Sequence, residues 1–402
     1  MNKVYGTERM PIKSWVTDLE DGALTQAKHL ANLPFLYKHV ALMPDTHQGY
    51  GMPIGGVIAT EGVVIPNAVG VDIGCGMCAQ KTSIKVEDFT TEILKQIMGE
   101  IRKAVPVGFN HRKVECDEDE MPNYPIADEK HYLPKVISEQ YTSARKQLGT
   151  LGGGNHFIEI QKGSDGFIWI MIHSGSRNLG LKVAKHYNDI AKVLNAKWHS
   201  SIPKEHDLAF LPLDTEEAKD YLEEMQYCLD FAFNNRVKMM NDVKDCFKKV
   251  LAPLIDYDTD DLLFPTFYNI HHNYAAMENH FGKNVMVHRK GATSAREGEI
   301  GIIPGSQGTC SYIVRGLGNP DSFQSCSHGA GRKMGRREAQ RTLNLEEEQK
   351  KLNDKGIVHS VRNAKDLDEA PGSYKDIDVV MKNQEDLVEI VVKLEPLGVI
   401  KG

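Results

Sequence analysis

Residues 57–78, VIATEGVVIPNAVGVDIGCGMC, decide which kind of fold this chain can form. From Val57 to Asp72 the residues are apolar, β-branched and punctuated by glycine, which predicts β-strands. The following segment, Val86–Val105, predicts a helix, because its apolar residues recur at helical spacing and share one face. These apolar residues are Phe89, Ile93, Ile97 and Ile101. Strand therefore leads to helix in this part of the chain.

The rest of the chain continues this mixture. Residues 214–251 keep a helical period, which predicts one long helix, or two helices that break near Asn234 and Asn235. A further helix is predicted over Leu181–Lys197. Strands are predicted over Phe157–Ile160, Phe167–Ile172, Val285–Arg289, Ile300–Ile303 and Tyr312–Arg315. The predicted class is therefore α+β, with a core that is largely not helical.

The chain is expected to form one domain, residues 1–402. No repeat of fixed period and no linker rich in proline, glycine or serine divides it. Residues 111–132 are predicted to be a surface insertion, because Cys116–Glu120 is acidic and two prolines follow it, at Pro122 and Pro125.

Composition limits the class of protein. The chain is 41% hydrophobic and 26% charged, which is typical of a soluble globular protein. Its net charge of −7 argues against a protein that coats nucleic acid through charge alone, although a local basic site is compatible with it. Met1–Trp15 has no signal-peptide pattern, which predicts a cytoplasmic protein. Its seven scattered cysteines are then expected to be free thiols, any special one being catalytic or a metal ligand.

Asp72 and Cys75 stand three residues apart in a glycine-rich turn, at the predicted end of an apolar strand. Gly74 and Gly76 allow the backbone to fold so that both side chains can face one point. Cys75 also forms a C-x-x-C with Cys78. By itself this pair fits two buried small residues, a redox pair or half of a zinc knuckle. The knuckle needs a second C-x-x-C, which the chain lacks.

Three further segments offer histidines. A glycine run at 152–154 could bind an anion through its backbone amides and is followed by His156. His173 follows an apolar strand, and His271 and His272 are adjacent. Neighbouring residues on a strand point to opposite faces, so only one of these two is expected to join a given site. Taken singly, each segment fits a satisfied histidine at a strand end or a surface loop equally well.

Together these segments supply a carboxylate, a thiolate and imidazoles: Asp72, Cys75, His156, His173 and His272, or His271 in its place. Such donors suit zinc or manganese and do not suit magnesium. Five ligands exceed the needs of one tetrahedral site, and a thiolate can bridge two ions. The sequence therefore predicts a two-metal centre.

Two later segments suit phosphate. Residues 304–311, PGSQGTCS, offer hydroxyls and backbone amides, although a tight turn explains them equally well. Residues 325–337, SCSHGAGRKMGRR, place His328 in a turn of small residues and predict a helix directly after it, with Arg332 and Arg336 one turn apart. A helix N-terminus with two guanidiniums on one face predicts a phosphate site. A histidine beside phosphate can act as a nucleophile, an acid or a base.

In this order the motifs resemble those of the RtcB-type RNA ligases, over nearly the whole chain. The matching segments are Met43–Asp45, His47–Gly49, Asp72–Cys75, Asn155–Glu159, His173–Arg177, His272–Asn273, Pro304–Ser306, His328–Arg332 and Lys401–Gly402. The resemblance implies a single large domain whose mixed or antiparallel sheet core is surrounded by helices. It also implies a ligase, acting in RNA repair or tRNA splicing, that joins RNA 2′,3′-cyclic phosphate or 3′-phosphate ends to 5′-hydroxyl ends with GTP and manganese.

The resemblance also implies a role for each motif. His328 matches the nucleophile that takes GMP from GTP, after which GMP passes to the RNA 3′-phosphate and is displaced by the 5′-hydroxyl. One manganese would be bound by Asp72, Cys75 and His156, and the other by Cys75, His173 and His272. The guanylate-binding positions are Asn155, His156, Phe157, Ile158, Glu159, His272, Asn273, Pro304, Gly305, Ser306, Gln307, Ser311, His328, Gly329, Ala330, Gly331 and Lys401. The candidates for holding RNA or phosphate are Asp45, Arg177, Arg332 and Arg336.

Two residues depart from the family pattern. Gln307 stands where methionine is common, and Cys78 is an additional thiol that could form a disulfide with Cys75 under oxidation. The expected partner is RNA with broken ends, and some relatives also work with an activator called archease. The lack of a coiled-coil seam predicts a monomer.

Two other functions fit the same residues. Two metals and a pair of arginines would also serve a phosphoesterase that acts on RNA ends, which needs neither GTP nor a covalent histidine. A GTP-sensing RNA-binding protein without turnover is the other alternative, and the acidic net charge makes it less suitable.

Overall fold

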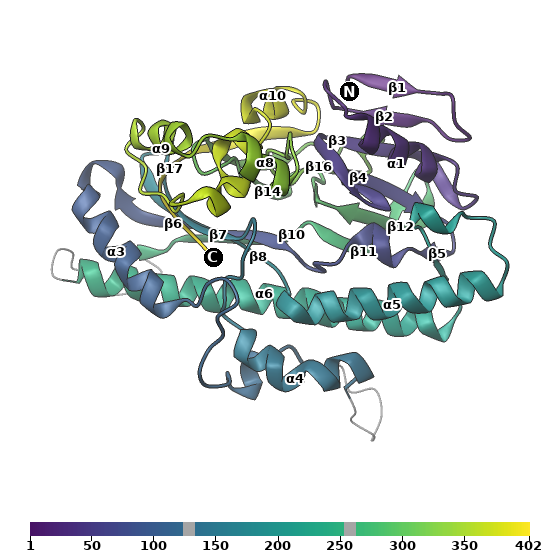
Figure 1. Cartoon of the computed structure of the whole chain (residues 1–402), viewed down its shortest axis with the longest axis horizontal. Coiled ribbons are helices and arrows are strands. Elements are labelled where there is room, and N and C mark those ends of the chain that lie inside the picture. Colours follow the sequence, from purple (N-terminus) through teal and green to yellow (C-terminus); the bar gives the residue numbers. More distant parts are fainter. Residues whose placement is uncertain (124–132, 253–262) are drawn as a thin grey trace.

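The computed structural model describes residues 1–123, 133–252 and 263–402 and shows an α+β protein built on two large sheets (Figure 1). Within these residues, the first sheet has six strands in the order β1-β2-β3-β4-β12-β11, and only its β2–β3 pair is parallel. The second has seven strands in the order β10-β6-β8-β7-β17-β15-β14, and its described pairs are antiparallel. The predicted class and the predicted mixed or antiparallel core are confirmed.

Among the described residues, the strands fall into four sheets. The first sheet contains β1 (Lys3–Tyr5), β2 (Ile12–Ser14), β3 (Leu36–Tyr50), β4 (Met52–Thr60), β11 (Asn273–His280) and β12 (Lys283–Lys290). The second contains β6 (Gly76–Lys85), β7 (Phe157–Gly163), β8 (Phe167–Ser174), β10 (Thr266–His271), β14 (Ile300–Ile303), β15 (Ser311–Gly316) and β17 (Val388–Lys401). Two small sheets pair β5 (Val63–Val64) with β9 (Leu211–Pro212) and β13 (Ala292–Ser294) with β16 (Ser325–Ser327).

The helices surround these sheets. In the parts of the chain that the structure describes, the α-helices are α1 (Asp21–Ala31), α2 (Pro66–Val69), α3 (Thr91–Ala104), α4 (Lys135–Gln147), α5 (Arg177–Lys197), α6 (Glu216–Leu251), α8 (Arg336–Thr342), α9 (Leu345–Asn353) and α10 (Ile377–Lys382). The short 3-10 helices are η1 (Val86–Asp88), η2 (Glu118–Glu120), η3 (Lys204–His206), η4 (Pro320–Ser322), η5 (Ala364–Glu369) and η6 (Pro371–Ser373). Apart from the corrections given below, the predicted strands and helices are present, with ends shifted by a few residues.

The seven-stranded sheet lies between two layers (Figure 1). One face packs on α3 and α6 through a buried apolar cluster that includes Ile158, Ile172, Met240 and Phe247. The other face packs on the C-terminal segments around α9 and η5 through Trp169, Met171, Leu352 and Leu367. Alternation along the strands produces this arrangement, since successive side chains point to opposite faces.

Helix α6 is continuous over 36 residues, so the predicted long helix is right and the predicted break is wrong. The polar residues that suggested the break contact loops of the molecule instead. Asn235 is fully buried, and its Oδ1 accepts hydrogen bonds from the backbone N–H groups of Gly149 and Thr150. Asn234 donates to the backbone oxygen of Glu120. Their polarity therefore marks tertiary contacts of a straight helix.

Two local predictions are corrected. The first apolar region does not continue as strand to Asp72, because β5 ends at Val64 and Pro66 opens the short helix α2. Asp72 and Cys75 consequently precede strand β6 and do not end a strand. The helix predicted directly after His328 begins only at Arg336, because Gly331 has a φ of +72°, in the left-handed region.

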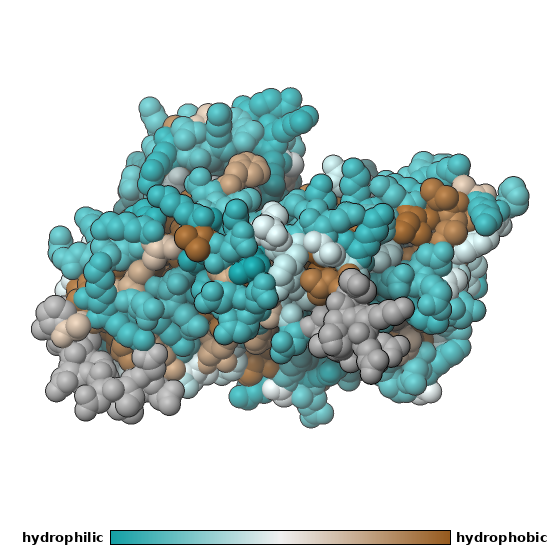
Figure 2. All heavy atoms as spheres, turned by 90° about the horizontal axis from the view of Figure 1, so that it is seen from below, coloured by the Kyte–Doolittle hydropathy of each residue, from teal (hydrophilic) through white to brown (hydrophobic). Residues whose placement is uncertain are grey.

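Of the predicted surface insertion, residues 124–132 lie outside the described residues. In the described part, Cys116 and Met121 are buried in the apolar cluster beneath α4, α5 and α6. The lower face of the molecule is mostly hydrophilic, with separate hydrophobic patches (Figure 2). Among the described residues, no helix combines the length and the apolar character that a membrane crossing requires.

Candidate active site

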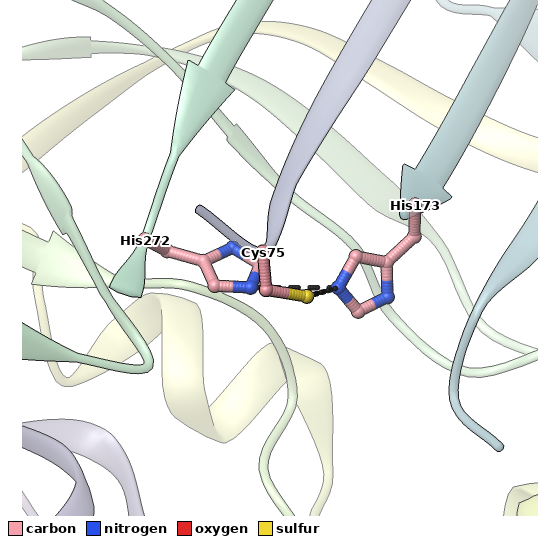
Figure 3. A group of neighbouring side chains, drawn as sticks. All are labelled: Cys75, His173 and His272. Atoms are coloured by element: carbon pink, nitrogen blue, oxygen red, sulfur yellow. Dashed lines mark hydrogen bonds between the residues drawn. The ribbon is translucent and has the colours of Figure 1, made fainter. Parts of the chain in front are cut away.

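The five predicted metal ligands meet at one point although they come from separate segments. Figure 3 shows Cys75, His173 and His272 facing one another. The Sγ atom of Cys75 lies 3.3 Å from Nε2 of His173 and 3.5 Å from Nε2 of His156. Nε2 of His173 is 3.4 Å from Nε2 of His272, and Nε2 of His156 is 3.2 Å from Oδ2 of Asp72.

These ligands form two triads that share Cys75. The buried triad consists of Cys75, His173 and His272, all of them buried. The open triad consists of Asp72, Cys75 and His156, and the side chain of Asp72 is 32% exposed. In each triad the possible ligand atoms lie within 4.8 Å of one another.

Sheet register explains why these segments converge. Strand β6 lies between β10 and β8, and its first residue, Gly76, is paired with both His271 and Ser174. Cys75 and His272, which adjoin these paired positions, therefore lie at the same end of the sheet. A hydrogen bond of 2.9 Å from the backbone N–H of His272 to the backbone oxygen of Cys75 joins the two segments directly.

Hydrogen bonds fix which nitrogen of two histidines is available to a metal. Nδ1 of His156 lies 3.0 Å from the backbone oxygen of Leu151, and Nδ1 of His173 lies 3.1 Å from that of Asn155. A carbonyl oxygen only accepts, so each Nδ1 carries the hydrogen and each Nε2 presents a lone pair toward Cys75.

The protonation states also fit a metal site. Burial lowers the pKa of His173 and of His272 well below the ordinary histidine range, so both rings are neutral, as metal ligands must be. Burial, with the added charge of Asp72, raises the pKa of the Cys75 thiol well above its usual value. A nearby cation is therefore needed to hold Cys75 as a thiolate. Imidazole, thiolate and carboxylate together suit a transition metal or zinc.

The structure decides between the two adjacent histidines. His272 joins the buried triad, whereas Nδ1 of His271 lies 3.2 Å from the backbone oxygen of Gly74. The Nδ1 atom of His272 has no hydrogen-bond partner among the described residues.

Cys78 lies away from the cluster. It is fully buried in the apolar layer between β6 and α6, whereas its strand neighbours Met77 and Ala79 face the opposite layer. Cys75 and Cys78 are both free thiols. The proposed disulfide between them gains no support from this arrangement, because the two side chains leave the backbone on different sides.

His328 is held by a buried carboxylate. Its Nδ1 lies 2.6 Å from Oδ2 of Asp45, and its backbone N–H donates to the same oxygen at 3.2 Å. Gly331 allows this approach, since a Cβ there would lie 2.2 Å from the backbone oxygen of Asp45. The His328 ring meets that of His272 edge to face, with centroids 4.8 Å apart. His328 therefore lies against the buried triad with its Nε2 not engaged by Asp45.

Arg332 and Arg336 converge on a carboxylate that sequence reasoning missed. Nη1 of Arg332 lies 3.1 Å, and Nε of Arg336 3.4 Å, from Oε1 of Glu369, and Nζ of Lys401 lies 3.1 Å from its Oε2. Burial alone would raise the pKa of Glu369, but these cations hold it below its usual value. The prediction that Arg332 and Arg336 lie one turn apart on a helix is wrong, because Arg332 precedes α8. No sequence motif marks Glu369, which is one of three acidic residues in η5.

A cavity of about 520 Å³ lies beside this cluster. Gly154, Gln307, Glu369 and Lys401 are among the residues that line it. The Gln307 side chain donates to the backbone oxygen of Glu369 at 2.9 Å. The cavity thus joins two of the predicted guanylate positions, Gln307 and Lys401, with the end of the glycine run.

The other predicted guanylate positions lie around the same region. Lys401 stands opposite Phe157 in the β17–β7 pair, and the Phe157 ring contacts His173. Burial raises the pKa of Glu159 to about 8. The side chain of Ile158 lies in the apolar core, which leaves only its backbone for a ligand. Ala330 is also buried in an apolar cluster.

The remaining positions build turns. The amide of Asn273 donates to the backbone oxygen of Asp72 and accepts from the N–H of Gly291. The hydroxyl of Ser311 accepts from the N–H of Gly305, and that of Ser306 contacts Thr309. A Cβ on Gly329 would lie 3.4 Å from the oxygen of Pro304, so these two predicted segments are neighbours.

Arg177 lies on the side of the open triad. It opens α5 with a φ of +58°, and its Nε donates to Oγ1 of Thr150 at 3.3 Å. Gly152 leaves room for it, because a Cβ there would lie 2.0 Å from Nη1 of Arg177.

Comparison with known proteins shows similarity over nearly the whole chain. The family model described as tRNA-splicing ligase RtcB matches residues 26–402. The chain is 40% identical over 408 residues to the RNA-splicing ligase RtcB of Escherichia coli (strain K12), an alignment that covers 98% of each chain. It is 33% identical to the tRNA-splicing ligase RtcB of Pyrobaculum aerophilum, covering 95% of this chain and 91% of that one. With the corresponding protein of Archaeoglobus fulgidus the identity is 34%, over 96% and 92%.

Proposed function

The chain belongs to the RtcB family of RNA ligases, and on that premise we propose that it joins broken RNA ends in RNA repair or tRNA splicing. The ends would be a 2′,3′-cyclic phosphate or 3′-phosphate on one side and a 5′-hydroxyl on the other. GTP would supply the energy and manganese would be the metal. The observation that supports this proposal most directly is the imidazole of His328, held through Nδ1 by Asp45 and resting against the buried triad.

His328 would be the nucleophile. Its Nε2 would attack the α-phosphorus of GTP, forming a nitrogen–phosphorus bond as the bond to pyrophosphate breaks. The Asp45 carboxylate would keep the hydrogen on Nδ1, orient the ring and stabilise the positive charge that develops on it. An oxygen of the RNA 3′-phosphate would then take GMP from His328, and the 5′-hydroxyl would displace GMP. A cyclic phosphate would first be opened by hydrolysis.

The two triads fit a pair of manganese ions that share the Cys75 thiolate. Ions bound there would neutralise charge on the α-phosphate during attack. Glu159 would face the guanylate in its protonated form below about pH 8, because burial raises its pKa to about 8. Arg332, Arg336 and Lys401 form a positive cluster beside the cavity, which suits the phosphates of nucleotide or RNA. Arg177 would hold phosphate on the side of the open triad.

The proposal has a direct test. The protein is incubated with manganese and GTP labelled at the α-phosphate, and an acid-labile protein adduct is measured. We expect label on the wild type and none on His328→Ala, whose metal content should be unchanged. Absence of label on the wild type, or label on His328→Ala, would overturn the mechanism.

The same samples distinguish the alternatives. Incubation with a 3′-phosphate RNA and a 5′-hydroxyl RNA should give a joined product that depends on GTP. A phosphoesterase would release phosphate without GTP, and a GTP sensor would bind GTP without forming either adduct or product.

We also propose a cytoplasmic, monomeric enzyme whose turnover an archease-like activator could increase. Light scattering of the purified protein tests the monomer. Addition of an archease to the ligation reaction tests the activator.

A further inference from the structure

The buried side chain of Arg236 has no role in the reaction proposed above, yet it contacts three separate segments of the site. It is fully buried in the middle of α6. Its Nη1 donates to the backbone oxygens of Gly74 at 3.0 Å and Ser174 at 2.9 Å. Its Nη2 lies 3.2 Å from Nδ1 of His271, and its Nε donates to Oδ1 of Asn269 at 2.6 Å.

Three of these partners adjoin metal ligands in the chain: Gly74 adjoins Cys75, Ser174 adjoins His173, and His271 adjoins His272. The ligands concerned are the complete buried triad. One guanidinium therefore contacts the backbone just before β6, the backbone at the end of β8, and two side chains of β10.

The ligands that belong to the open triad alone are held by other groups. The backbone oxygen of Asp72 accepts from the amide of Asn273 at 3.0 Å. Nδ1 of His156 lies 3.0 Å from the backbone oxygen of Leu151. The contacts of Arg236 are thus distributed unequally between the triads.

Two glycines make room for this arrangement. A Cβ on Gly74, whose φ is +72°, would lie 3.0 Å from Cβ of Ala232 and 3.2 Å from the backbone oxygen of Cys228, both on α6. A Cβ on Gly76 would lie 3.0 Å from the guanidinium carbon of Arg236. The glycines on either side of Cys75 therefore let α6 approach closely enough for Arg236 to reach all three strands.

We propose that Arg236 is the positioning residue of the buried metal triad, an inference that rests on the metal centre proposed above. A guanidinium presents five N–H donors in one rigid plane and can bond to several loops at once. The compact ammonium of a lysine cannot reproduce that plane. Since outer contacts orient metal ligands, their loss typically costs about 10- to 100-fold in metal affinity.

The experiment measures manganese binding in backgrounds that retain one triad. Asp72→Asn leaves the buried triad, and His272→Ala leaves the open triad. Arg236→Lys is introduced into each, and affinity is measured by calorimetry and by the paramagnetic resonance of free manganese. We expect about 10- to 100-fold weaker binding in the Asp72→Asn background. The loss should be smaller in the His272→Ala background, where only the contact at Gly74, beside the shared Cys75, bears on a remaining ligand.

A cobalt-substituted protein adds a spectroscopic measurement. Visible bands of bound cobalt report ligand geometry, so Arg236→Lys should shift them more in the Asp72→Asn background than in the His272→Ala background. Unchanged affinity and spectrum in that background, or equal weakening in both, would overturn the proposal. Failure of the wild type to bind any metal would instead refute the proposed metal centre itself, so the two failures are distinguishable.

Arg112 provides a matched control. It also ties backbone carbonyls to α6, since it donates to the oxygens of Leu148 and Gly149 and pairs with Asp242. Arg112→Lys should lower thermal stability without changing manganese affinity in either background.

If Arg236→Lys fails to fold, Asn269→Ala, which removes the Nε partner of Arg236, takes its place. It should also lower the manganese affinity of the buried triad, and an unchanged affinity would overturn the proposal.

Discussion

The two metal triads share one thiol but lie in different surroundings. The buried triad lies against His328, and its histidines are kept neutral by burial. The open triad includes Asp72, whose side chain is 32% exposed, and lies on the side of Arg177. We infer from this difference that a metal ion in the buried triad would act mainly in the attack of His328 on GTP. A metal ion in the open triad would act mainly on the RNA 3′-phosphate that reacts afterwards.

The largest effect is expected when both triads are damaged together. Cys75→Ser removes the shared thiolate, so both ions and all detectable ligation should be lost, a decrease of at least about 10³-fold. Metal content per chain and product formation measure this. A Cys75→Ser protein that retains one tightly bound ion would contradict the sharing of Cys75.

Cys78→Ser is the control for that variant. Cys78 is buried beneath α6 and contacts neither triad, so the variant should retain both ions. Its sensitivity to oxidants should equal that of the wild type. Protection against oxidants would instead support a disulfide with Cys75.

Damage to the group that orients His328 should have the next largest effect. Asp45→Asn keeps the shape of the side chain but loses the charge that holds Nδ1–H and stabilises the charged ring. We expect adduct formation to fall by about 10²- to 10⁴-fold. Manganese content should not change, because Asp45 contacts neither triad through its carboxylate. Simultaneous loss of metal would show that Asp45 acts through the metal centre.

Variants of single triads test the division of work between the two ions. His272→Ala and Asp72→Asn should each lose one ion. His272→Ala should slow adduct formation more, by about tenfold or more relative to Asp72→Asn, because only His272 contacts the His328 ring. Single-turnover rates of adduct formation and of RNA joining measure the two steps separately. If each variant slowed both steps equally, the proposed division of roles between the two triads would be wrong.

The smallest expected effect is on the pH dependence of folding stability, through the buried carboxyl group of Glu159. Burial raises the pKa of Glu159 to about 8 from an ordinary value of 4.5. The folded protein therefore retains a proton that the unfolded chain has lost, and this group makes stability fall as pH rises from about 4.5 to about 8. Glu159→Gln removes this contribution.

The Gln variant should therefore gain melting temperature over the wild type as the pH rises through that range. Melting curves at several pH values test this. A constant difference between the two proteins would show that Glu159 does not titrate as its burial requires.

The sequence identified most residues of the candidate metal cluster, because residue type alone restricts which side chains can bind a transition metal. Thiolate, imidazole and carboxylate in glycine-rich segments are recognisable without a structure, and Cys75, His156 and His173 lie where they were expected. The prediction of a helix directly after His328 was wrong, because local charge and spacing do not reveal the conformation of Gly331. The close approach of Asp45 imposes that conformation. The prediction of a break in α6 was wrong for a related reason. The polar side chain of Asn235, which suggested the break, is hydrogen-bonded to a loop distant in the sequence.

By itself, the sequence determined the class of fold and the kinds of donor atom, because both follow from side-chain chemistry and periodicity. Only the tertiary structure decided which of those atoms meet. It selected His272 over His271, brought Asp45 to His328 across 283 positions of the chain, and gathered Arg332, Arg336 and Lys401 on Glu369. It also placed Arg236 beneath three strands. Such contacts depend on sheet register and helix packing between remote segments, and no local pattern encodes them.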